Sequence, residues 1–286
     1  MHPIIDSHVH ILDPDRFPYA DDAWYKPIGA ERGTADDLTH LMQHHGVQHA
    51  LLVQPNSGYQ FDNRCMLSAI ANSNGRFKGM AVVENECSLR KLQDLQGQGV
   101  VGIAMNVALL GVDFYADIEP LLNHLRDLGM WAQMQVQHDQ LVQISPLLEA
   151  SGAKLLFDHC GRPNPKDSID QAGFQALLAL AETGRAVVKL SGFNKCSVQH
   201  YPWDDSKVFV DALLQAYTPH NLIWASDWPF LKAPARIDYG PLLTLFEQLV
   251  PDAAARRAIQ WETPLRLFKF DQPLTHTDKL QLQLQR

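Results

Sequence analysis

Hydrophobic and polar positions along this chain follow two alternating patterns. Short apolar runs of about five residues recur, and most are followed by a stretch in which apolar residues return every three or four positions. The first pattern is typical of a buried strand and the second of an amphipathic helix. Because repeated strand–helix units build parallel sheets, the pattern predicts an α/β protein.

Eight of the apolar runs are predicted strands, and they cover residues 3–8, 49–53, 78–83, 100–105, 131–136, 154–158, 186–190 and 221–225. Eight ordered repeats are the number that closes a (β/α)₈ barrel, or TIM barrel. The alternative is an open doubly wound sheet, but its marker, a G-x-G-x-x-G turn after the first strand, is missing. We therefore predict a single-domain TIM barrel over residues 1–270, followed by a polar tail over residues 271–286.

Several connections between these elements are also informative. A helix predicted over residues 117–128 ends at Gly129, where we expect a left-handed cap. Two long loops, residues 12–34 and 191–205, are rich in aromatic, proline and charged residues. Loops of this length in a compact fold usually form lids or binding walls, so we expect both near a ligand site.

Composition narrows the class of partner. The 286 residues carry a formal net charge of −8, and Lys and Arg are not clustered as a nucleic-acid or anionic-membrane surface requires. The four cysteines are widely spaced, no apolar stretch has bilayer length, and the N-terminus lacks a signal peptide. We expect a cytoplasmic protein that acts on a small molecule. A homo-oligomer is compatible with the sequence.

Two histidines end the first predicted strand, in the run Asp-Ser-His-Val-His at residues 6–10. Side chains alternate between the two faces of a strand, so His8 and His10 are predicted to point the same way. An H-x-H spacing alone is weak support, since incidental pairs are common. Its position favours function, because barrel enzymes carry catalytic groups at the C-terminal ends of their strands.

Two more strand ends carry candidate chemistry. His159 follows the sixth strand, and Asp227 follows the eighth within Ser-Asp-Trp-Pro. A lone buried histidine is often only a core residue, and an aspartate at this place is often a helix N-cap. The Trp228-Pro229 pair favours a loop over an immediate helix. Together, His8, His10, His159 and Asp227 are predicted to converge at one barrel mouth as a catalytic site.

These motifs resemble the amidohydrolase superfamily, specifically its amidohydrolase-2 branch of TIM-barrel hydrolases. Local matches at residues 53–55 with Tyr59, 188–192 and 262–268 are similar to the subgroup that contains 2-pyrone-4,6-dicarboxylate lactonase and sugar lactonases. The resemblance implies a hydrolase that opens a lactone. It assigns Asp227 as the general base that activates water, and His8, His10 and His159 as the groups that polarise the carbonyl and hold the oxyanion.

The same four residues are possible metal ligands, since a zinc hydrolase needs about three protein ligands and one open position. Many superfamily members add a strand-four Lys or Glu and a strand-five His, whereas these strands end here near Asn106 and Gln137. A binuclear centre is therefore not expected. Because the resembled branch includes metal-free members, we favour chemistry that requires no cofactor. A single divalent metal such as zinc, in an amidohydrolase or decarboxylase, is the alternative.

Residues around these motifs indicate a carboxylated lactone as substrate. The Arg162 guanidinium suits a bidentate pair with a carboxylate, although a surface salt bridge is the alternative. Lys195 stands where the resembled dicarboxylate lactonase carries arginine, and Ala104 and Met105 replace a common Arg-Phe pair, so the pyrone dicarboxylate itself is not expected. The predicted substrate-binding residues are Arg162, Lys195, Gln54, Tyr59, Asn106 and Trp228. A non-catalytic binding barrel is disfavoured because all four catalytic candidates are present.

Overall fold

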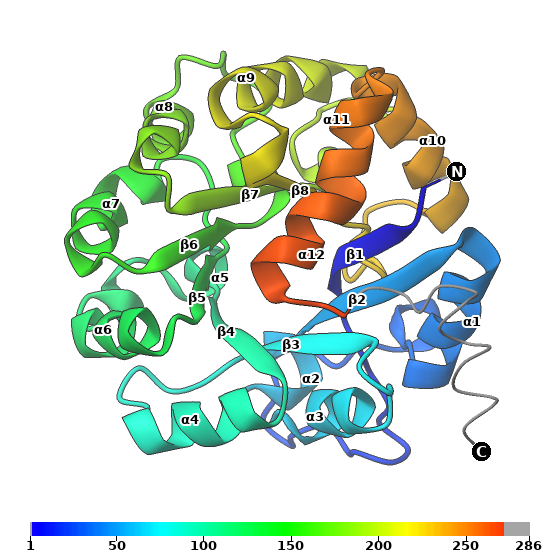
Figure 1. The fold of residues 1–286 in the computed structure, drawn as a ribbon, viewed down its shortest axis with the longest axis vertical. Helices are drawn as coiled ribbons and strands as arrows, with labels where there is room; N and C mark the ends of the chain where they lie inside the picture. Colours follow the sequence, from blue (N-terminus) through cyan, green and yellow to red (C-terminus); the bar gives the residue numbers. More distant parts are fainter. Residues whose placement is uncertain (1, 272–286) are drawn as a thin grey trace, which may run out of the picture.

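The structure, a computed structural model, describes residues 2–271 and contains one sheet of eight parallel strands in the order β1 to β8 (Figure 1). A parallel bridge between Val9 and Trp228 brings the first and last strands together, so the sheet is a nearly closed barrel. The fold is the predicted (β/α)₈ TIM barrel. The strands are β1 Ile4–Val9, β2 Val47–Val53, β3 Phe77–Ala81, β4 Val100–Met105, β5 Trp131–Met134, β6 Lys154–Phe157, β7 Ala186–Leu190 and β8 Leu222–Trp224. All predicted strand ends lie within two residues of these bounds.

The helices lie around the outside of the strands or across the two ends of the barrel (Figure 1). They are α1 Ala35–His45, α2 Asn56–Tyr59, α3 Arg64–Ala71, α4 Leu89–Gly97, α5 Val107–Leu110, α6 Glu119–Leu128, α7 Gln140–Ser151, α8 Ala172–Ala179, α9 Lys207–Tyr217, α10 Tyr239–Leu249, α11 Ala253–Arg257 and α12 Thr263–Phe268. Helix α6 ends at Gly129 with φ 66°, the left-handed cap predicted from the sequence.

The apolar core has two layers. The larger layer fills the space between the strands and the outer helices, and the smaller one fills the barrel interior. Trp261 and Phe268, from the π-helical turn Ala258–Glu262 and from α12, pack against the inward side chains of the smaller layer, among them Ile5, Leu156 and Val187. This apolar plug closes the N-terminal end of the barrel. The polar side chains inside the barrel lie toward the other end, where the strands finish.

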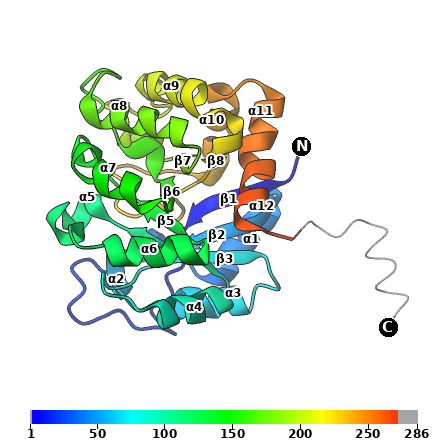
Figure 2. The same ribbon diagram turned by 60° about the vertical axis from the view of Figure 1, so that its left-hand side comes forward.

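Figure 2 shows the two ends of the barrel: α12 lies at the end where the strands begin, and α2 and α5 lie at the end where they finish. In the described part of the chain, no helix has the length and apolar character needed to cross a membrane. Beyond residue 271, the predicted polar tail lies outside the described residues.

Candidate active site

The C-terminal ends of the strands open into a cavity of about 390 Å³. Eight of the residues predicted to act on or bind substrate line it: His8, His10, Gln54, Asn106, His159, Arg162, Lys195 and Asp227. Both long loops singled out in the sequence also reach it, through Trp24 and through Asn194 with Lys195. The predicted site residues therefore share one space, although they are distant in sequence.

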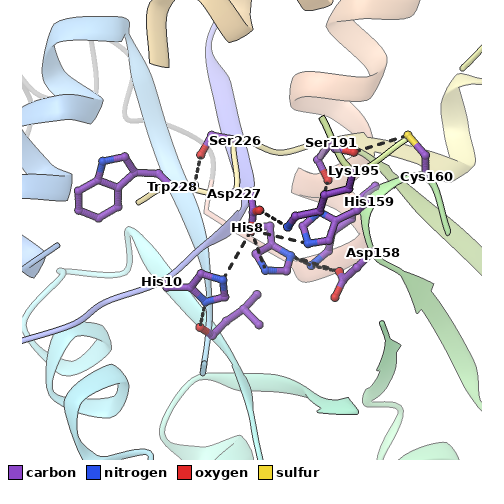
Figure 3. Close-up of polar contacts among 12 residues, drawn as sticks. His8, His10, Asp158, His159, Cys160, Ser191, Lys195, Ser226, Asp227 and Trp228 are labelled. Carbon is purple, nitrogen blue, oxygen red and sulfur yellow. Dashed lines mark hydrogen bonds and ion pairs between the residues drawn. The ribbon is translucent and has the colours of Figure 1, made fainter. Parts of the chain in front are cut away.

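Asp227 lies where the three imidazoles meet (Figure 3). Its Oδ1 atom is 3.7 Å from Nε2 of His8 and 3.6 Å from Nε2 of both His10 and His159. Two backbone hydrogen bonds hold β1 against the loop after β8: Asp227 N–H donates to the His8 carbonyl at 3.0 Å, and His10 N–H donates to the Trp228 carbonyl at 2.8 Å. The convergence thus depends on the closure of the barrel.

Unusual backbone conformations direct two of these side chains. Asp227 has φ 67° and His159 has φ 51°, a left-handed region that residues other than glycine adopt rarely. Gly192, at φ 60°, makes room for His159, because a Cβ at this position would lie 2.8 Å from the Cβ of His159. Both catalytic candidates are therefore held by loop geometry that the surrounding contacts must maintain.

Each imidazole also has a partner at its second nitrogen. Nδ1 of His10 donates to the Val53 carbonyl at 2.7 Å, and since a carbonyl only accepts, the proton of the neutral ring sits on Nδ1 and leaves Nε2 as an acceptor. Nδ1 of His159 lies 3.0 Å from Ser191 Oγ, which can donate or accept. Nδ1 of His8 faces the buried side chains of Asp158 and Lys189.

Burial keeps two of the rings neutral. Desolvation, and next the nearby charge of Lys189, lower the pKa of His8 to about 4. Desolvation and then the charge of Lys195 hold the pKa of His159 well below its ordinary value. At neutral pH these rings are therefore uncharged hydrogen-bonding groups rather than cations.

A buried polar layer lies between the apolar plug and the cavity. Lys189 Nζ is 3.0 Å from Asp158 Oδ1, 2.8 Å from Gln133 Oε1 and 3.0 Å from His8 Nδ1. Gln133 Nε2 donates to the other oxygen of Asp158 at 3.0 Å. Burial alone would raise the pKa of Asp158, but Lys189 and His8 outweigh it and hold this pKa below its ordinary value. The site prediction missed Lys189, Asp158 and Gln133, although a lysine inside the apolar run 186–190 was a visible signal.

Lys195 is the direct partner of the central carboxylate. Its Nζ forms an ion pair with Oδ2 of Asp227, the oxygen that does not face the imidazoles. Burial alone would raise the pKa of Asp227, but Lys195, and then His159, outweigh it and hold this pKa well below its ordinary value. Asp227 is therefore ionised at neutral pH.

A family model described as amidohydrolase matches residues 5–270. The chain belongs to the amidohydrolase family. This amidohydrolase is 29% identical over 273 residues to the 4-sulfomuconolactone hydrolase of Rhizobium radiobacter, covering 92% of this chain and 89% of the relative. It is 24% identical over 277 residues to the 2-pyrone-4,6-dicarboxylate hydrolase of Comamonas testosteroni, with the same two coverages.

A solved structure of a relative has the same fold over nearly the whole chain. The probable 2-pyrone-4,6-dicarboxylic acid hydrolase of Acinetobacter baumannii, crystallised with citric acid bound, superposes with a TM-score of 0.82 at 26% identity, over 93% of this chain and 99% of that one. The family match and these lactone-hydrolase relatives identify the amidohydrolase as a hydrolase, as its motifs predicted.

Two predicted substrate-binding residues of the amidohydrolase lie away from the cavity. Tyr59 is buried in the outer core, and its hydroxyl accepts a hydrogen bond from the Asp13 backbone at 3.0 Å. The Trp228 ring packs onto Gly33, so closely that a Cβ there would lie 2.2 Å from it, and it points away from Asp227 (Figure 3). The expectation that these two aromatic side chains line the site is therefore corrected.

The other predicted binding residues reach the cavity with polar groups. Arg162 takes part in none of the ion pairs found between residues 2 and 271. Gln54 donates to the Asp62 carbonyl at 2.9 Å, while its buried Oε1 has no hydrogen-bond partner within residues 2–271. Asn106 donates to Asn56 Oδ1 at 3.2 Å.

A metal ion would find a donor set here. His8, His159 and Asp227 offer ligand atoms that all lie within 4.8 Å of one another, and His10 is not part of this group. The charges fit less well. The ammonium groups of Lys195 and Lys189 already pair with Asp227 and Asp158, so a divalent ion would add two uncompensated positive charges to a buried site. The residues therefore suit a divalent ion in geometry but not in charge.

Proposed function

We propose that this amidohydrolase hydrolyses the lactone ring of a small carboxylated substrate. The observation that carries the proposal is the convergence of three imidazole Nε2 atoms on Oδ1 of Asp227, at 3.6 to 3.7 Å, inside a cavity that also holds Arg162. These separations are too long for direct hydrogen bonds. Oδ1 is therefore available to a water molecule, and the imidazoles are available to a substrate oxygen.

In the proposed reaction, Asp227 Oδ1 accepts a proton as the oxygen of that water attacks the lactone carbonyl carbon. His10 Nε2, an acceptor in the neutral ring, orients the water by accepting a hydrogen bond from its second O–H, which stays on the attacking oxygen. The negative charge that develops on the carbonyl oxygen is stabilised by an imidazole N–H donor. Collapse of this intermediate breaks the ring C–O bond, and the departing oxygen takes the proton from Asp227. The product is an open hydroxy acid.

Lys195 couples substrate binding to the strength of the base. In the ion pair with Oδ2, it lowers the pKa of Asp227, and a base with a low pKa accepts a proton poorly. A substrate carboxylate draws the ammonium group away from Asp227. The carboxylate left in a desolvated site then becomes a stronger base at the moment when substrate is present.

Arg162 and Gln54 are the proposed recognition groups. The Arg162 guanidinium lines the cavity and forms no ion pair with another residue of the described range 2–271, which suits a bidentate contact with a substrate carboxylate. The buried Oε1 of Gln54, which has no donor among residues 2–271, suits a substrate hydroxyl, because a buried acceptor without a donor destabilises the folded state until one is supplied.

A panel of carboxylated and neutral lactones, followed by acid release at constant pH, tests the proposal. We expect hydrolysis of carboxylated members, and we expect it to persist after dialysis against a chelator. The zinc-dependent alternative rests on the donor cluster of His8, His159 and Asp227. Stoichiometric zinc together with loss of activity on chelation would favour that alternative, and a panel without any turnover would reject lactone hydrolysis.

A further inference from the structure

Lys189 is an unusual residue for the inside of a barrel. It lies on β7 two positions after Val187, whose side chain belongs to the inner apolar layer, and it is fully shielded from solvent. Side chains two apart on a strand share a face, so Lys189 extends into the barrel between the plug and the catalytic cavity. A buried ammonium group is costly unless it is paired and fully hydrogen-bonded. Its partners therefore define its role.

We propose that Lys189 is a positioning residue that fixes His8 in the tautomer with its proton on Nε2, and that it thereby opposes binding of a divalent metal in the active site.

The number of donors and acceptors supports this assignment. An ammonium group has three N–H donors and no acceptor. Lys189 Nζ has three neighbours at hydrogen-bond distance: Asp158 Oδ1 at 3.0 Å, Gln133 Oε1 at 2.8 Å and His8 Nδ1 at 3.0 Å. The match is complete only when Nδ1 of His8 carries a lone pair. The ring proton then lies on Nε2, the atom that faces Asp227 Oδ1 and the cavity.

The opposite tautomer leaves a donor without an acceptor. Nδ1 of His8 is also 3.2 Å from Asp158 Oδ1, so a proton on Nδ1 would donate to that carboxylate. The third N–H of Lys189 would then meet another N–H only 3.0 Å away, and both side chains are buried from solvent. An unsatisfied buried donor costs about 1–3 kcal/mol, which is enough to select one tautomer.

This choice of tautomer bears directly on metal binding. A histidine that ligates a metal through Nε2 usually donates its Nδ1 proton to a carboxylate, and Asp158 is placed for that contact. Lys189 occupies the same acceptor and presents a positive charge to the ring. With Lys189 in place, His8 Nε2 is a hydrogen-bond donor to the cavity, and its lone pair is not available to a cation.

The role of this N–H in polarising a substrate carbonyl rests on the proposed function. The tautomer and the resistance to metal do not, because both are properties of the enzyme without substrate. Failure of lactone turnover would leave the assignment of Lys189 untouched.

Nitrogen-15 NMR of histidine-labelled protein tests the assignment directly, with His8→Gln identifying the His8 signals. In the wild type we expect an unprotonated Nδ1 and a protonated Nε2 at His8. In Lys189→Met we expect the reverse, with Nδ1 donating to Asp158. A wild-type spectrum with the His8 proton on Nδ1 overturns the proposal, whether or not any variant folds.

Zinc affinity gives the second measurement, by calorimetry on wild type, Lys189→Met and the control Lys78→Met. Lys78 is a half-buried lysine on β3 that packs against Phe270, so the control makes the same replacement away from the site. We expect at least tenfold tighter zinc binding in Lys189→Met alone. Equal affinities in all three proteins overturn the metal part of the proposal. If Lys189→Met does not fold, zinc affinity is measured on the neutral double variant Lys189→Met/Asp158→Asn, where we again expect tighter binding than in the wild type because the lysine charge is absent.

Discussion

Lys195 and Asp227 form an ion pair that engages only one oxygen of the carboxylate. Nζ of Lys195 contacts Oδ2, while Oδ1 faces the Nε2 atoms of the three histidines. The two oxygens thus have different surroundings: one is neutralised by a cation and the other faces the cavity in which the proposed reaction takes place. Replacement of either residue is expected to affect catalysis by a different route.

Asp227→Asn removes the proposed base while keeping the size of the side chain. We expect kcat to fall by about 10² to 10⁴, the usual contribution of a general base. The variant should still fold and melt cooperatively, because the amide still accepts hydrogen bonds and no longer has a charge to desolvate. Steady-state kinetics on the best lactone of the panel, with a thermal melt of each protein, make the comparison. Full turnover by the variant would exclude Asp227 as the base.

Arg162→Met tests recognition of the substrate carboxylate. A charge-assisted hydrogen bond contributes about 1.5–3 kcal/mol, so we expect KM for a carboxylated lactone to rise about 10- to 100-fold. KM for a neutral lactone should change little. Arg236→Met is the matched control, since Arg236 is an exposed residue that pairs with Asp238. An equal loss on charged and neutral lactones would show that Arg162 supports the structure rather than the carboxylate.

Much of the fold and part of the site follow from local patterns in the sequence. Strands such as β4 and β7 were predicted with their observed bounds, because a buried parallel strand is a continuous apolar run between polar turns. His8 and His10 share a face since they are two apart at a strand end. These features need only the chain's own periodicity and the rule that barrel sites lie at strand ends.

Other parts depend on contacts that no local pattern encodes. The pairing of Lys189 with Gln133 depends on the register between β5, β6 and β7, in which Gln133 aligns with Leu156 and Leu156 aligns with Val187, two positions before Lys189. The Trp228 ring turns away from the site because Gly33, on a distant loop, leaves a surface for it. Tyr59 follows Gly58, whose φ of 75° sets the direction of the chain there, and this backbone angle was not predictable from the pattern.

Gly192→Ala tests whether the position of His159 matters for catalysis. Any L-residue at φ 60° is strained by about 1 kcal/mol, and a methyl group would also press on the His159 ring, whose Nδ1 lies 3.0 Å away. Gly184→Ala is a close control, since Gly184 has φ 65° and no atom within 4 Å of the added carbon. We expect similar backbone strain in both variants but a loss of kcat only in Gly192→Ala. Equal activities would mean that His159 tolerates displacement.

His49 provides a test of stability at acidic pH, away from the active site. Its ring is stacked near Trp261 and Phe270, with centroids 5.9 and 4.8 Å away, and burial lowers its pKa in the folded protein. The unfolded chain takes up a proton on this residue near its ordinary pKa of about 6.5. Below that pH the unfolded state binds more protons than the folded state, so the folded state loses stability as the pH falls.

His49→Phe keeps an aromatic ring in the same stack and removes the titrating group. Denaturant unfolding at a series of pH values from 7.5 down to 5 measures the effect, as the difference in unfolding free energy between variant and wild type. We expect this difference to shift in favour of the variant as the pH falls below about 6.5. His200→Phe, at an exposed position, should not show the shift. Parallel pH curves for His49→Phe and wild type would mean that burial does not suppress protonation of His49.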